Sequence, residues 1–207
     1  MSEQPLTQSP FPDLPEGTLT FLFTDIEGST RLLEQLRDQH AVLLDEQREL
    51  LRLAFSHWNG REIDTQGDAF FVAFGKAIEA VNCVMEAQHR LAEHDWPQGV
   101  SVRVRMGLHT GEPIVGRTGY VGMAVHRAAR IAHAGHGGQV LLSEITSGLV
   151  VDDLPSGAHL VDLGRHLLKD LNRPEHIYQL DMDGLPGEFP DLKSLEQLPP
   201  ESRRQPR

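Results

Sequence analysis

The chain has little of what secreted, membrane and nucleic-acid-binding proteins need. Its single cysteine, Cys83, cannot form an internal disulfide. It has 19 basic against 30 acidic residues, and a formal net charge of −11 argues against a broad nucleic-acid-binding surface. No apolar run approaches membrane-spanning length, and the N-terminus lacks the basic start and apolar centre of a signal peptide. These absences predict a soluble cytoplasmic protein that binds neither nucleic acid nor membrane.

Proline divides the chain into three predicted parts. Four prolines within residues 1–16 predict a flexible N-terminal arm. Five prolines among charged residues predict a Pro-rich linker or tail over residues 183–207. The chain is 39% hydrophobic, which is enough for the core of one domain over residues 17–182.

The hydrophobic periodicity of this domain predicts strands that alternate with helices. The expected elements are a strand at 19–23, a helical region at 29–57 with an internal break, two strands within 61–74, a helix at 76–94, a strand at 100–108, a helix at 121–134, and short strands from residue 139 onward, at 159–163, 167–169 and 176–180. This order predicts an α+β, ferredoxin-like fold, with a mixed or antiparallel sheet covered by helices on one side.

Two aspartates are expected at neighbouring ends of this sheet. Asp25 follows the first strand, and Asp68 lies at the tip of the predicted hairpin. In a ferredoxin-like arrangement these strands are neighbours, so the two carboxylates would share divalent cations through oxygen ligands. Residues 28–30 (Gly-Ser-Thr) begin a helix whose unpaired N–H groups favour phosphate. Taken singly, Asp25 would also suit a helix N-cap and Asp68 a turn.

Four segments together resemble the catalytic domain of class III adenylate and guanylate cyclases, over about residues 17–182. They are Phe23–Thr30, Gln66–Phe70, Arg105–Gly111 and Val125–Arg130. The resemblance implies a nucleoside triphosphate substrate, two divalent metal ions (Mg²⁺ or Mn²⁺) and a head-to-tail homodimer with shared active sites. Pro190–Pro199 is similar to the linker that leads to an ATPase module in some actinobacterial relatives.

The resemblance also implies roles for individual residues. Asp25, Asp68 and the carbonyl of Ile26 match the metal ligands; Gly28, Ser29 and Thr30 match the phosphate-binding turn; Arg105 and Lys169 match basic residues near the triphosphate. Arg130, from the partner chain, matches the arginine that stabilises charge on the reacting α-phosphate. By itself, Arg130 would equally fit a solvated helix face or a salt bridge.

Three positions depart from the pattern of active cyclases. Asp64 stands where adenylate cyclases place a lysine and guanylate cyclases a glutamate, and a carboxylate accepts hydrogen bonds from guanine better than from adenine. Gly119 has no side chain for a base contact, and His126 replaces an asparagine that orients the ribose. The predicted function is conversion of ATP or GTP to a 3′,5′-cyclic nucleotide and pyrophosphate. The alternative is a weak or inactive cyclase-like domain that binds nucleotide or dimerises to regulate a partner.

Overall fold

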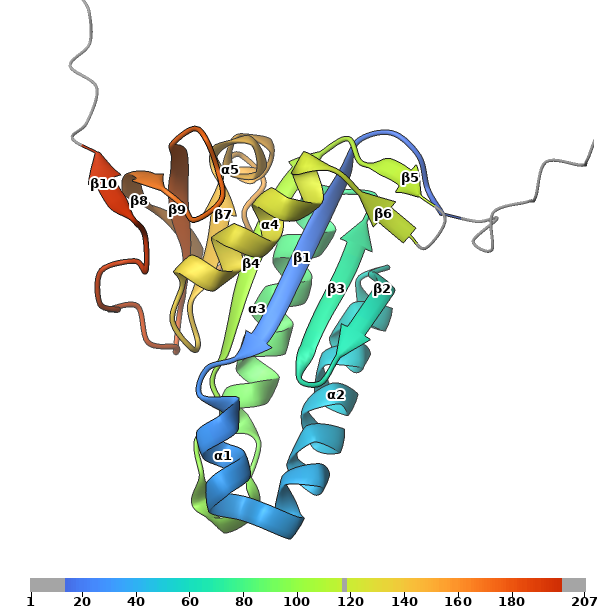
Figure 1. The fold of residues 1–207 in the computed structure, drawn as a ribbon, viewed down its shortest axis with the longest axis vertical. Helices are drawn as coiled ribbons and strands as arrows, with labels where there is room; N and C mark the ends of the chain where they lie inside the picture. The colour runs from blue at the N-terminus through green and yellow to red at the C-terminus, as the bar shows by residue number, and fades with distance from the viewer. Residues whose placement is uncertain (1–13, 117–118, 199–207) are drawn as a thin grey trace, which may run out of the picture.

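The computed structural model describes residues 14–116 and 119–198 and contains one large mixed sheet (Figure 1). Its strands are β1 Leu19–Ile26, β2 Arg61–Gln66, β3 Ala69–Phe74, β4 Val104–Gly111, β7 Val140–Ser143, β8 Ala158–Leu167, β9 Glu175–Met182 and β10 Glu196–Leu198. They lie in the order β10-β8-β9-β7-β4-β1-β3-β2, and neighbours are antiparallel except for β4 and β7. The predicted α+β fold with a mixed sheet is confirmed.

Helices cover both faces of this sheet (Figure 1). The helical elements are α1 Ser29–Leu36, η1 Arg37–Gln39, α2 His40–His57, α3 Ala77–Glu93, η2 Pro97–Gly99, α4 Met123–Ala134 and α5 Glu144–Val150. Leu22 of β1 packs in one core with residues of α2 and α3, while Phe21 packs in a second core with Ala128 of α4. The expectation of helices on one side was therefore wrong, because β1 is apolar on both faces.

Helix α4 lies unusually close to strand β4. A Cβ atom added to Gly107 of β4 would lie 2.6 Å from the Cα atom of Ala132 in α4. Non-bonded carbon atoms do not approach this closely, so a side chain at residue 107 would displace the helix. The position of α4 on the sheet is therefore fixed by contact between backbones.

Several boundaries differ from the sequence prediction. The helical region breaks at Arg37, whose φ is 48°, and resumes as α2. Strand β4 begins at Val104 rather than residue 100, and the expected strand at 167–169 is only the end of β8. The short hairpin of β5 Ile114–Gly116 and β6 Gly119–Val121 was not predicted, because three-residue strands show no periodicity.

Residues 183–198, here named the C-terminal extension, pack on the domain. The backbone N–H of Lys193 donates to the carbonyl of Ala134 at 2.8 Å, and β10 pairs with β8. Gln179 of β9 also donates to the carbonyl of Gly187 at 2.7 Å. This part of the predicted linker or tail thus extends the sheet, while residues 199–207 lie outside the described residues.

The N-terminal arm is described only from residue 14 onward, so its prediction for residues 1–13 lies outside the structure. The carbonyl of Pro15 accepts a hydrogen bond of 2.6 Å from the Tyr120 hydroxyl, and Leu14 packs against the second core. No helix within the described ranges is both long and apolar enough to cross a lipid bilayer.

Candidate active site

Asp25 and Asp68 lie side by side where β1 ends and the β2–β3 hairpin turns. The Ile26 N–H donates to Asp68 Oδ2 at 3.0 Å, which ties the hairpin tip to the end of β1. Burial raises the pKa of Asp68 above its usual value, and the negative charge of Asp25 raises it further. Hydrogen bonds from the backbone and from Ser29 oppose this rise in pKa. The local environment therefore favours an added positive charge.

Arg105 already supplies a positive charge to this pair. It lies directly across from Asp25 in the β1–β4 register, and its Nε donates to Asp25 Oδ2 at 2.9 Å. Its Nη2 donates to the same oxygen. Arg105 was predicted to lie near the triphosphate. The structure instead places its side chain on the carboxylate of Asp25.

The oxygen donors at this place fit a hard divalent cation. Two carboxylates and the neighbouring Ile26 carbonyl are ligands that Mg²⁺ and Mn²⁺ accept. The Asp25 carboxylate already has a cationic partner in the Arg105 guanidinium. No group of three or more His, Cys, Asp or Glu residues in the described part of the chain could hold a metal, so phosphate or water oxygens would have to complete the coordination.

Gly28 forms the turn between Asp25 and helix α1. Its φ of 75° and ψ of 28° are left-handed, a conformation that glycine adopts without strain. Its carbonyl accepts hydrogen bonds from Arg31 at 2.9 Å and Leu32 at 3.1 Å. Ser29 and Thr30 occupy the first positions of α1, where backbone N–H groups have no intrahelical acceptor. The turn therefore presents donors next to the carboxylates.

Three further predicted site residues belong to other elements. His126 and Arg130 are on α4, and Lys169 follows β8. His126 and Lys169 are exposed, and Arg130 forms a 2.7 Å ion pair with Asp170 of the same chain. Among the residues that the structure describes, no hydrogen bond or ion pair joins these three residues to Asp25 or Asp68. One chain therefore holds two separate groups of predicted site residues.

Gly119, one predicted base-selecting position, lies near the residue that precedes the other, Asp64. A Cβ added to Gly119 would lie 3.5 Å from the Ile63 side chain, next to Asp64 in the sequence. Asp64 is exposed on β2 and accepts hydrogen bonds from the Thr65 N–H and from the Gln66 side chain, both at 2.9 Å. The φ of 125° at Gly119 would strain any other residue there.

Sequence reasoning missed the role of Glu27. Its carboxylate accepts hydrogen bonds from Lys193 Nζ at 2.6 Å and from the Gly137 N–H at 3.1 Å. The Lys193 hydrogen bond is the main cause of a lowered Glu27 pKa. Glu27 lies between Ile26 and Gly28, so the C-terminal extension is joined directly to the candidate site.

This fold, with an acidic pair beside a helix-initiating turn, defines a nucleotide-cyclase type of domain. The family model described as "Adenylate and Guanylate cyclase catalytic domain" matches residues 13–181, and the chain belongs to this family.

Relatives and solved structures agree with this assignment. An uncharacterized protein of Mycobacterium tuberculosis is 36% identical over 187 residues, which cover 89% of this chain and 63% of the relative. An adenylate cyclase of Podospora anserina is 29% identical over 84% of this chain and 11% of its own length. A monomeric Trypanosoma brucei adenylate cyclase structure aligns with a TM-score of 0.75 and 25% identity, covering 87% of this chain and 96% of that one. The chain thus spans less than two thirds of the mycobacterial relative.

Proposed function

We propose that this domain is a metal-dependent nucleotidyl cyclase in cyclic-nucleotide signalling. It converts ATP or GTP to the 3′,5′-cyclic nucleotide and pyrophosphate. The observation that carries this proposal is the Asp25–Asp68 pair, placed beside the Gly28 turn in a domain of the cyclase family. Bound divalent cations would lower the proton affinity of the ribose 3′-hydroxyl and neutralise phosphate charge.

The residues of the chain would bind and orient the nucleotide. Asp25, Asp68 and the Ile26 carbonyl hold the cations, and the N–H groups of the turn at residues 28–30 hold phosphate. Arg105 and Lys169 add positive charge near the triphosphate. The 3′-oxygen then attacks the α-phosphorus, and pyrophosphate leaves without a protein nucleophile.

A head-to-tail homodimer would join the two separated groups of residues. Arg130 and His126 lie four positions apart on α4, so they share one helix face. From the partner chain, Arg130 would stabilise charge on the α-phosphate and His126 would contact the ribose. The support for this arrangement is that Arg130 pairs with Asp170 of its own chain rather than with a group at the carboxylate pair.

A regulatory domain without turnover is the second candidate. Arg130 is paired with Asp170, and Arg105 is paired with Asp25, so two predicted cationic groups are engaged within the chain. Gly119 also offers no side chain to a base. In this case the domain binds nucleotide or dimerises to regulate a partner.

Cyclase assays with Asp25→Ala separate the two candidates. We expect wild-type protein to form cyclic AMP or cyclic GMP with Mg²⁺ or Mn²⁺, and its specific activity to rise with protein concentration as dimers form. Asp25→Ala should lower turnover at least about 100-fold, the scale of losing one group that stabilises the transition state.

Asp152→Ala is the matched control, because Asp152 is exposed in the turn after α5. Undiminished turnover in Asp25→Ala would show that Asp25 is not a ligand of a catalytic metal ion. Background activity in the folded wild-type dimer would favour the regulatory candidate.

Asp64→Lys tests base selection. We expect the ratio of activity with ATP to activity with GTP to rise about tenfold, because lysine donates to adenine N1 whereas a carboxylate accepts from guanine. The kcat/KM values for both nucleotides give this ratio. Glu49→Lys makes the same change of charge at an exposed position of α2 and should leave the ratio unchanged. An unaltered ratio in Asp64→Lys would show that residue 64 does not read the base.

A further inference from the structure

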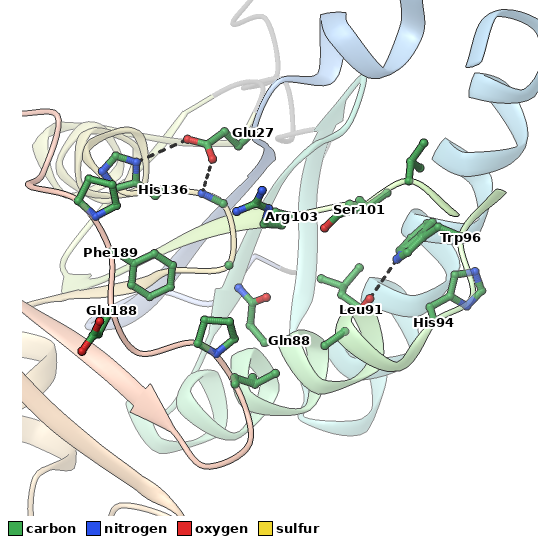
Figure 2. A pocket seen from close by; sticks show the side chains of 18 residues that line it. Glu27, Gln88, Leu91, His94, Trp96, Ser101, Arg103, His136, Glu188 and Phe189 are labelled. Carbon is green, nitrogen blue, oxygen red and sulfur yellow. Dashed lines mark hydrogen bonds and ion pairs between the residues drawn. The ribbon is translucent and has the colours of Figure 1, made fainter. Parts of the chain in front are cut away.

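A cavity of about 510 Å³ lies between the C-terminal extension and the end of α3 (Figure 2). His94, Trp96 and residues 100–103, which precede β4, and the turn at 136–138 complete its walls. This volume lies within the range of pockets that bind small molecules. The cavity is separate from the carboxylate pair, although Glu27 contributes to its wall.

Most of the cavity wall is apolar. Leu91 and Trp96 are buried, with 3% and 6% of their surfaces exposed, and the Trp96 indole N–H is already satisfied by the Leu91 carbonyl at 3.1 Å. The extension contributes Phe189, whose ring is drawn at the opposite side of the cavity (Figure 2). Such a wall suits a flat or alkyl apolar body.

Two polar side chains in the wall have atoms that could form a further hydrogen bond or ion pair. Gln88 is 5% exposed; its Nε2 donates to the Val104 carbonyl at 2.8 Å, while its Oε1 has no partner among the described residues. Within the same described ranges, the Arg103 guanidinium has neither a hydrogen bond nor an ion pair. By contrast, Glu27 is neutralised by Lys193. Both side chains line the cavity, so the Arg103 guanidinium can pair with an anion of a bound ligand and Gln88 Oε1 can accept a hydrogen bond from it.

We propose that this cavity binds a small amphipathic monoanion. Its apolar body lies against Leu91 and Phe189, its carboxylate, sulfonate or phosphate group pairs with Arg103, and one N–H or O–H donates to Gln88 Oε1. Glu188 in the wall disfavours a second negative charge on the ligand. The site does not depend on the nucleotide-binding role of the domain.

Fluorescence titration with 8-anilinonaphthalene-1-sulfonate tests this site, because the probe combines an aromatic body, a single anion and one N–H. We expect saturable binding of one probe per full chain. Arg103→Gln and Phe189→Ala should each weaken the affinity about tenfold, which corresponds to about 1.4 kcal/mol. Leu149→Ala, on an exposed face of α5 distant from the cavity wall, should leave the affinity unchanged.

Arg103 is exposed, so Arg103→Gln retains the fold even if Phe189→Ala loosens the extension. Unchanged affinity in Arg103→Gln, or binding without saturation, would overturn the site. A competition experiment then tests the charge of the ligand. Naphthalene-1-carboxylate should displace the probe at least about tenfold more effectively than neutral naphthalene-1-methanol. Equal displacement would overturn the assignment of Arg103 as the anion partner.

Discussion

A mixture of Asp25→Ala and Arg130→Ala chains should recover about a quarter of wild-type cyclase activity if each site is shared across a two-fold dimer. Each variant alone should be nearly inactive, because every site in its homodimer lacks one essential group. In a mixed dimer both changes fall in the same site, and the other site is intact. The pairing of Arg130 with Asp170, and not with the carboxylate pair, within one chain motivates this expectation.

The measurement is cyclic nucleotide formation after chains carrying different affinity tags have been mixed and exchanged. An Asp25→Ala and Asp68→Ala mixture is the matched control. These residues belong to the same group, so both sites of the mixed dimer remain damaged and no activity should return. If heterodimers of Asp25→Ala and Arg130→Ala are purified and remain inactive, the shared site is excluded.

Gly107→Ala should destabilise the protein by about 3 kcal/mol, the upper part of the range for forced overpacking. The added methyl group would meet the backbone of Ala132, which has no rotamer with which to move away. Since domains are stable by about 5–15 kcal/mol, this is a large fraction of the total. The urea midpoint of unfolding gives the change directly.

Gly148→Ala is a control for which the expected change in stability has the opposite sign. Gly148 lies within α5, and a Cβ there would have nothing within 4 Å. Alanine is favoured over glycine in helices by about 0.5–1 kcal/mol, so this variant should be more stable than wild type. Equal urea midpoints for Gly107→Ala and wild type would mean that α4 can shift on the sheet without cost.

The fold was largely predictable because its main signals are local. The apolar run at Leu19–Phe23 and the alternation of Phe70, Val72 and Phe74 identify strands that the structure places together. The position of α4 was not predictable in the same way. A strand that is apolar on both faces indicates two covering layers, but the sequence does not say which helix provides each layer.

The candidate site was predictable where a residue's position follows from the end of an element. Asp25 is the second-last residue of β1 and Asp68 sits in a hairpin turn, so adjoining strands bring them together. Ion pairs that depend on how far two side chains extend toward each other were not predicted. The Arg105–Asp25 and Arg130–Asp170 ion pairs require the register of β4 and the path of the loop after β8. Their functional roles stay predictions.

Lys193 also gives the candidate site a mechanical connection to the far end of the chain. Glu27 and Lys193 are separated by 166 positions, yet one ion pair joins them. A force applied beyond Leu198 would reach Glu27 through β10, a few residues of backbone and that ion pair. Since Glu27 precedes the Gly28 turn, a displacement of Lys193 would remove the ion-pair partner of the residue next to that turn.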